Sequence, residues 1–262
     1  MKKFELTAEF VTNVFGKKLF RIKALVAFGN VEKGELGGFI EKEDNLSHDG
    51  NAWVYGNALV YGDARVSGDA WVSGSALVYG DALVYGDARV FGDARVFGDA
   101  RVYGNARVSG SAWVYGDAWV YGDAWVSGSA WVYGNALVSG DARVYGNARV
   151  SGSARVYGDA WVYGDAWVSG SAWVYGDAQV SGNADFAVVT GFGRYFRSTT
   201  FFRCKDKILR VQCGCFYGDL AQFREIVKKT HGDSKYAKEY LAIADLMELH
   251  FSDEEENQEA AE

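Results

Sequence analysis

A six-residue alternation of apolar and polar positions runs through the middle of the chain. Gly recurs at every sixth position from Gly50 to Gly182, Ala from Ala52 to Ala184 and Val from Val54 to Val180, all without a break. The repeating unit reads A-[WLRQ]-V-[YSF]-G-[DNS]. Since side chains alternate along a strand, Ala and Val point to one face, and the Trp/Arg/Leu and Tyr/Ser positions point to the other. The pattern predicts short strands joined at Gly corners, whose apolar face is buried only when successive coils stack as a solenoid.

Two coil lengths fit this repeat: a triangular coil of three hexapeptides, or a flat two-sided coil of two hexapeptides. The periodicity alone predicts only a solenoid and is compatible with both. Folding the sequence at three hexapeptides per coil gives three outer columns of Trp, Arg and Leu, beside columns of Tyr and Ser. Every Trp of the chain is then expected to point outward, and together they form the predicted interaction surface: Trp53, Trp71, Trp113, Trp119, Trp125, Trp131, Trp161, Trp167 and Trp173.

Two interpretations of these outward columns stay open. A large exposed aromatic surface rich in Trp, Tyr and Arg is typical of protein interfaces. The same side chains could instead stabilise neighbouring coils through aromatic and cation–π contacts. Segments 110–134 and 152–176 are identical except at Trp113 and Arg155, and their offset of seven hexapeptides is not a whole number of three-hexapeptide coils. Because the copies fall on different faces, a rod or repetitive surface is favoured over one unique ligand site.

The uninterrupted Val-x-x-x-Ala-x repeat resembles the hexapeptide signature of left-handed parallel β-helices. The resemblance is to transferase-like hexapeptide-repeat proteins, including uncharacterised ones of bacteria and prophages. It implies a left-handed triangular prism and, for many such proteins, acyl transfer by a catalytic His at a site between protomers. Residues 51–182 contain no His, Lys, Glu or Cys, so the residues that this chemistry needs are missing from the repeats.

The two ends of the chain do not follow the repeat. Alternation around Asn13–Lys17 predicts a β-hairpin, and Gly34–Ile40 is expected to begin the first coil. Phe186 and Phe192 keep the six-residue spacing, which predicts that the coil continues past Ala184. The predicted organisation is an N-terminal β cap and first coil (1–49), a β-helix (50–192), a β-hairpin plus two helices (193–252) and an acidic disordered tail (253–262).

Within the C-terminal part, the predicted hairpin runs over 199–205 and 208–216. A helix is predicted from Asp219, which forms a capping box with Gln222, to His231, with Gly232 as the stop. A second helix is predicted from Ser234 to about Phe251.

Composition excludes several classes of protein. The chain of 262 residues has 33 Gly, no Pro and a formal charge of −7, which disfavours a general nucleic-acid binder. The basic-aromatic stretch from Phe192 to Lys205 could contact nucleic acid, but an edge strand with a solvated side is the commoner explanation. No apolar run approaches the ~20 residues of a membrane span. Three Cys cannot form a disulfide framework, so a cytoplasmic protein without membrane attachment is expected.

Few residues could carry chemistry, and none is predicted to be catalytic or to bind a metal or cofactor. His48 and His231 are weak catalytic candidates, the second explained by its place at a helix C-terminus. Cys204, Cys213, Cys215 and His231 could form a zinc site, and Cys213 and Cys215, two apart on a predicted strand, would share a face. Buried free Cys is the simpler explanation. A corner column of Asp and Asn could hold Ca²⁺, although such side chains more often bond to the backbone of the turn.

These observations favour a non-catalytic scaffold that presents Trp, Tyr and Arg columns to a protein partner or to copies of itself. Two alternatives remain. One is a hexapeptide-type acyltransferase with a site between protomers. The other is a phage-type inhibitor that sequesters a nucleic-acid-handling protein or a nucleotide.

Overall fold

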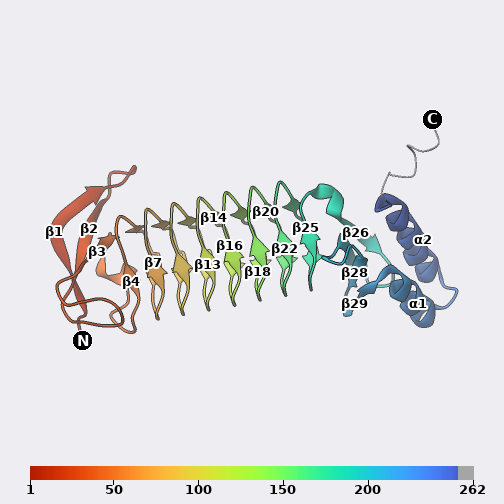
Figure 1. The fold of residues 1–262 in the computed structure, drawn as a ribbon, viewed down its shortest axis with the longest axis horizontal. Coiled ribbons are helices and arrows are strands. Elements are labelled where there is room, and N and C mark those ends of the chain that lie inside the picture. Colours follow the sequence, from red (N-terminus) through yellow and green to blue (C-terminus); the bar gives the residue numbers. More distant parts are fainter. Residues whose placement is uncertain (253–262) are drawn as a thin grey trace.

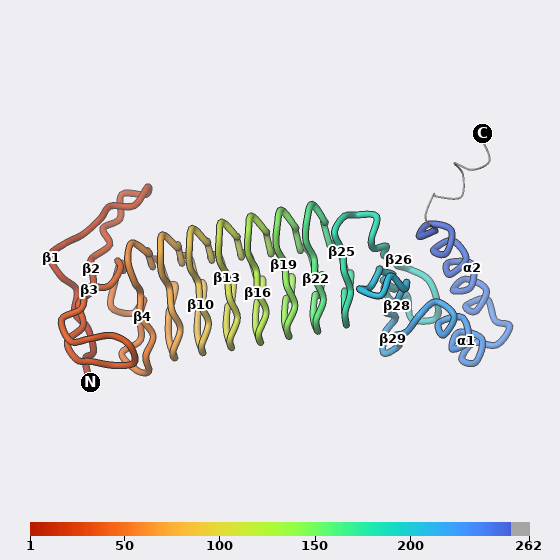
Figure 2. The backbone as a smooth tube through the Cα atoms, in the orientation of Figure 1, coloured from red at the N-terminus to blue at the C-terminus, as the bar shows by residue number. Residues whose placement is uncertain are grey.

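The protein is a long rod with a different cap at each end (Figure 1). This computed structural model describes residues 1–252. The segment 253–262, predicted to be an acidic disordered tail, lies outside the described residues. Figure 2 shows the evenly spaced coils of the rod between the N-terminal and C-terminal caps.

The rod is a parallel β-solenoid built of two-residue strands on three faces. Face 1 comprises β4 (Trp53–Val54), β7 (Trp71–Val72), β10 (Arg89–Val90), β13 (Arg107–Val108), β16 (Trp125–Val126), β19 (Arg143–Val144), β22 (Trp161–Val162) and β25 (Gln179–Val180). Face 2 comprises β5 (Leu59–Val60), β8 (Leu77–Val78), β11 (Arg95–Val96), β14 (Trp113–Val114), β17 (Trp131–Val132), β20 (Arg149–Val150) and β23 (Trp167–Val168). Face 3 comprises β6 (Arg65–Val66), β9 (Leu83–Val84), β12 (Arg101–Val102), β15 (Trp119–Val120), β18 (Leu137–Val138), β21 (Arg155–Val156) and β24 (Trp173–Val174).

Each strand pairs in parallel with the strand three hexapeptides further along the chain. Trp113 lies opposite Trp131, and Val114 opposite Val132. The triangular coil of three hexapeptides is therefore confirmed, and the flat coil of two hexapeptides is wrong. The Ala and Val of every repeat are completely buried along the axis, as their alternation predicts.

The corners need Gly for two reasons. From Gly50 to Gly176 every corner Gly has a positive φ, +70° at Gly122, where other residues are strained. A Cβ on Gly122 would also lie 3.0 Å from the backbone nitrogen of Gly140 in the next coil. The composition of the chain, rich in Gly, thus follows from a backbone that turns three times per coil.

The N-terminal cap continues face 2 as antiparallel strands. β1 (Phe4–Thr12) pairs with β2 (Lys18–Ala24), β2 with β3 (Leu36–Ile40), and β3 runs parallel to β5. The predicted hairpin and the predicted start of the first coil are both confirmed. A short 3₁₀ turn, η1 (Glu43–Asn45), follows.

Side chains of this cap bond to the carbonyls that the first coil would otherwise leave unpaired. Asn45 Nδ2 donates to the carbonyls of Gly62 and Ala64, at 3.0 and 2.8 Å. Lys3 Nζ donates to Gly50 and Ala52 in the same way, at 3.1 and 2.9 Å. The open end of a parallel solenoid is thereby closed against pairing with other strands.

At the other end the predicted continuation of the coil through Phe186 and Phe192 is wrong. After η2 (Asn183–Asp185), β26 (Phe186–Phe192) pairs antiparallel with β27 (Arg197–Arg203) in a separate sheet. The physical reason lies in the 3₁₀ turn. Asp185 Oδ2 accepts hydrogen bonds from the N–H groups of Ser181 and Gly182, and Asn183 Oδ1 accepts one from Trp167 N–H. These oxygens replace the carbonyls that a further coil would supply.

The C-terminal sheet has the order β26-β27-β28-β29, with β28 (Leu209–Cys213) and β29 (Phe216–Asp219). The predicted hairpin is confirmed in β27 and β28, which pair antiparallel. The prediction that Cys213 and Cys215 share a strand face is wrong, because β28 ends at Cys213. Gly214, with a φ of +61°, turns the chain directly into β29.

Two helices complete the C-terminal cap, α1 (Leu220–His231) and α2 (Lys235–His250), and both are confirmed. The predicted capping box is present: Asp219 Oδ1 accepts from Gln222 N–H at 2.8 Å, and Gln222 Oε1 accepts from Asp219 N–H at 3.0 Å. Neither helix of residues 1–252 combines the length and apolar character needed to cross a membrane.

Candidate functional site

Arg side chains of adjacent coils stack over most of the Trp rings on the faces of the rod. In each of six pairs the guanidinium carbon lies 4.9–5.1 Å from the indole centroid, within the range of a cation–π contact. The pairs are Arg89–Trp71, Arg95–Trp113, Arg101–Trp119, Arg143–Trp161, Arg149–Trp131 and Arg155–Trp173. These six Trp are half-buried within their own chain.

The same Trp rings also contact an aromatic ring of the preceding coil, sixteen residues earlier in the sequence. Phe97 meets Trp113 edge-on at 6.0 Å, and Tyr103 meets Trp119 at 6.3 Å. The outward columns therefore stabilise one another from coil to coil, as the second of the two interpretations expects.

A continuous ladder of five stacked rings runs along face 2. Its centroids are 4.8–5.0 Å apart and its planes lie within 3° of parallel. The rings belong to Tyr61, Tyr79, Phe97, Tyr115 and Tyr133. Burial raises the pKa of the Tyr61 phenol to about 12 and also raises the pKa of Tyr79 and Tyr115. The ladder therefore favours neutral phenols.

Trp125 and Trp167 are the exceptions among the outward Trp. Sixteen residues before each of them stands a Ser, Ser109 and Ser151, instead of an aromatic residue. Each indole N–H donates to that Ser Oγ at 3.0 Å. Trp125 and Trp167 are 38% and 47% exposed, more than any other Trp. They are equivalent positions of the duplicated segment, so comparison of residues sixteen apart would have singled them out in the sequence.

Trp53 contradicts the prediction that every Trp points to solvent. It is completely buried, with Phe28 and Phe4 edge-on at 5.4 and 6.2 Å. The reason is its place in the first coil, where the N-terminal cap folds over face 1. Trp53 belongs to the core of the cap and not to the interaction surface.

His48 lies in a groove of about 520 Å³ at the N-terminal end of face 3, together with Glu43 and Arg65. Its Nδ1 accepts a hydrogen bond from Lys3 N–H at 3.3 Å, and its Nε2 lies 3.7 Å from Glu43 Oε2. The ring stacks on Phe4 at 4.3 Å. Both ring nitrogens thus face protein groups, and neither presents a free lone pair to the groove.

Of the four predicted zinc candidates, Cys204 lies apart from the other three, which line one cleft of the C-terminal cap. Cys204 is buried against the end of the solenoid, and burial raises its thiol pKa to about 12. Cys213 is half-buried against the core of the C-terminal cap and accepts a hydrogen bond from Thr199 Oγ1 at 3.2 Å, while Cys215 is exposed. His231 lines a cleft of about 210 Å³ with Cys213 and Cys215, and its ring stacks on Tyr240. Among residues 1–252 no three His, Cys, Asp or Glu residues converge closely enough to hold a metal ion.

The corner column of Asp and Asn bonds to itself between coils. Asn51 Nδ2 donates to Asp69 Oδ1 at 2.7 Å, and Asn105 Nδ2 donates to Asp123 Oδ1 at 3.0 Å. These amide–carboxylate bonds give Asn51 and Asn105 a partner in the next coil.

Eight segments of the rod match the family model described as YdcK beta-solenoid repeat. They are residues 60–74, 64–80, 100–116, 118–134, 130–145, 142–158, 154–170 and 160–176. The matches and the geometry agree that this is a β-solenoid repeat protein. They cover less than half of the chain and neither cap, so the likeness is one of repeats. No curated protein matches the chain.

Proposed function

We propose that this protein is a non-catalytic scaffold, a rigid rod that associates with a second copy of itself through Trp125 and Trp167. The observation that carries the proposal is the contrast among the Trp of the rod. Six are shielded by an Arg and an aromatic ring of their own chain, whereas Trp125 and Trp167 have a Ser in place of the aromatic ring and are the most exposed. Exposed Trp is the residue type most enriched at energetic centres of interfaces.

Rigidity follows from the bonding between coils. The backbone N–H of Trp125 donates to Ala142 O, and that of Ser127 donates to Val144 O, each at 2.9 Å. The same backbone pattern repeats along the rod. With both ends closed by side-chain hydrogen bonds, the rod has the character of a spacer that holds surfaces in register.

The arrangement of His48 gives the acyltransferase alternative no support. A general base must point a lone pair at the proton that it removes. The Nδ1 lone pair of His48 is directed at Lys3 N–H, and Nε2 faces Glu43.

Sedimentation velocity over a wide concentration range tests the scaffold. We expect reversible association that is lost in the double variant Trp125→Arg/Trp167→Arg, since Arg already occupies equivalent positions at Arg107 and Arg149. The matched control is Trp119→Arg/Trp131→Arg, which changes two shielded Trp and should leave association intact. A wild-type monomer that turns over acetyl-CoA, with the activity lost in His48→Ala, would establish the enzyme instead.

A further inference from the structure

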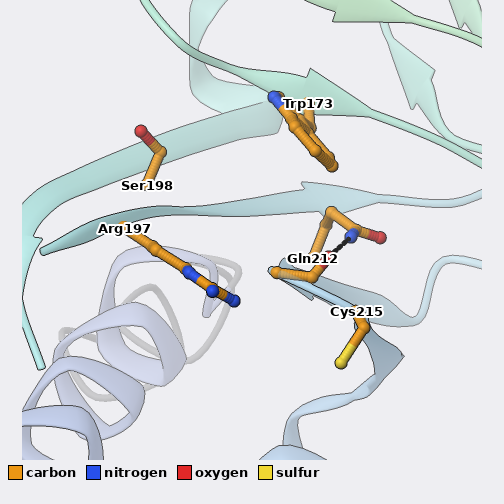
Figure 3. Close-up of a pocket in the computed structure, with 6 residues that line it drawn as sticks. Trp173, Arg197, Ser198, Gln212 and Cys215 are labelled. Atoms are coloured by element: carbon orange, nitrogen blue, oxygen red, sulfur yellow. Dashed lines mark hydrogen bonds between the residues drawn. The ribbon is translucent and has the colours of Figure 1, made fainter. Parts of the chain in front are cut away.

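The outward column of face 3 ends at Trp173, and an open groove lies where a further coil would continue the column. The groove has a volume of about 490 Å³ and is lined by Trp173, Arg197, Ser198, Gln212, Gly214 and Cys215. Figure 3 shows the indole of Trp173 projecting toward Gln212, while the Arg197 side chain extends toward Cys215. Its volume falls within the range of ligand pockets, roughly 300–1,000 Å³.

One side of the Trp173 ring is covered by its own chain. Arg155, in the preceding coil, stacks 4.9 Å from the indole centroid, and Tyr157 of that coil meets it edge-on at 6.4 Å. The position one coil further on is Gly191, which has left the solenoid for β26. The backbone N–H of Trp173, which would have paired with a further coil, donates instead to Thr200 Oγ1 at 3.0 Å. The backbone is capped, and among residues 1–252 no ring or guanidinium stacks on the other side of the indole.

On face 2 the position one coil after a Trp can hold a second ring, whereas on face 3 the position after Trp119 holds Leu137. Trp113 has the Arg95 guanidinium on one side and the Trp131 ring on the other, with the two indoles 5.3 Å apart and 9° from parallel. The groove over Trp173 therefore has the place and the platform for one more flat ring.

The charged side chains around the groove indicate which kind of ligand it would bind. None of the six lining residues is acidic. Arg197 stacks on Tyr195 at 5.0 Å and has no carboxylate partner within residues 1–252. Arg155, on the other side of the indole, is exposed and likewise forms no ion pair in that part of the chain. A cationic ligand would be repelled, whereas an anion could pair with the free guanidinium of Arg197.

Polar groups at the rim can position such a ring. The side chain of Gln212 is nearly buried, and its Nε2 donates to Gly214 O at 2.8 Å, which fixes the amide and leaves Oε1 free to accept. Ser198, next to Arg197 on β27, also lines the groove (Figure 3). A few placed polar groups around an aromatic platform are typical of small-molecule sites.

We infer that this groove binds a planar aromatic anion, a ring carrying a carboxylate or phosphate, with the ring stacked on Trp173 and the anionic group paired with Arg197. The site lies at the C-terminal end of the rod and is independent of association through Trp125 and Trp167, so either proposal can fail alone.

Titration with adenosine 5′-monophosphate, followed by calorimetry and by ligand-observed NMR, tests the site. We expect saturable binding that weakens about tenfold in Trp173→Leu, given what stacking on an aromatic side chain contributes. Leu occupies the same column at Leu83 and Leu137, so this variant suits the coil. Trp131→Leu removes a stacked Trp with both sides covered and should bind as the wild type does.

Arg197→Gln tests the anionic group of the ligand independently of its ring. The variant changes an exposed side chain and should therefore fold. It should weaken binding of adenosine 5′-monophosphate about tenfold, as loss of a charge-assisted bond predicts, and leave binding of adenosine unchanged. The proposal is overturned if adenosine 5′-monophosphate does not bind saturably. It is equally overturned if Trp131→Leu weakens binding as much as Trp173→Leu, or if Arg197→Gln affects adenosine and its monophosphate alike.

Discussion

The indole N–H of Trp125 donates a hydrogen bond to Ser109 Oγ in the preceding coil, at 3.0 Å. The same bond, at the same distance, joins Trp167 to Ser151. In both cases a small hydroxyl stands where other coils place an aromatic ring, and it holds the Trp while leaving much of the ring in solvent. The exposed Trp of this rod are therefore fixed in orientation before any partner arrives, which lowers the entropy lost on binding.

Ser109→Ala should destabilise the rod by about 1 kcal/mol, because Ser109 is buried and its hydroxyl makes a net-stabilising hydrogen bond. Ser127→Ala is the matched control, since Ser127 stands one coil further along the same column, and Arg143 occupies the position sixteen residues after it. Denaturant midpoints measured on both variants decide the matter. Equal shifts would mean that the Trp125 bond contributes nothing.

Gly122→Ala should cost about 1–2 kcal/mol, because a side chain at a φ of +70° is strained and its Cβ would lie only 3.0 Å from the backbone of the next coil. Gly182→Ala should change stability by less than about 0.5 kcal/mol. Gly182 has a φ of −151° and nothing within 4 Å of a Cβ added there. Thermal melts of the two variants compare the same substitution at a corner with positive φ and at one with extended backbone. Similar melting temperatures would contradict the prediction that Gly is required at Gly122.

The rod should lose stability as the pH rises above 10. Burial raises the pKa of Tyr61 to about 12 and raises the pKa of Tyr79 as well, while in the unfolded chain both phenols ionise near 10. The folded state thus binds more protons between pH 10 and 12, and its stability falls across that window. Tyr61→Phe/Tyr79→Phe should flatten the fall, measured as melting temperature against pH. Phe97 already shows that Phe fits the ladder. An unchanged slope in the double variant would contradict the prediction.

Lys3 should give the opposite slope at lower pH. Burial lowers its pKa from 10.5 to about 8, so above pH 8 the folded chain releases a proton that the unfolded chain still holds. Stability therefore rises with pH from about 8 until the unfolded amine titrates near 10.4. Lys3→Met should remove this rise, as seen in melting temperatures between pH 7 and 10. A rise that persists in Lys3→Met would assign it to another group.

The interior of the rod could be predicted because the structure of each hexapeptide follows from its own residues. Gly122 requires a corner, Ala118 and Val120 define the buried side, and the unbroken repeat keeps one register from coil to coil. The capping box at Asp219 is equally local, and the helix it begins was predicted to within a residue. Where structure depends on neighbours in sequence or on a strict repeat, the pattern is sufficient.

Two features at the ends of the rod were predicted wrongly, because side chains outside the repeat determine them. The spacing of Phe186 and Phe192 is that of another coil, yet Asn183 and Asp185 close the solenoid and direct the strand to β27. Trp53 matches the outward position of the repeat, yet the cap of residues 1–49 covers it. A local turn at Asn183–Asp185 closes the solenoid, whereas Trp53 is covered by Phe28 and Phe4 from far earlier in the chain, and the repeat carries no information about either.

The duplicated segment has a consequence for how such rods change length. Trp125 lies on face 1 and Trp167 on face 2, because the copies are offset by two full coils and one further hexapeptide. Gain or loss of one hexapeptide would therefore rotate everything beyond it by a third of a turn and advance it by a third of a coil. The number of hexapeptides therefore sets both the distance between the two caps and their relative rotation about the axis of the rod.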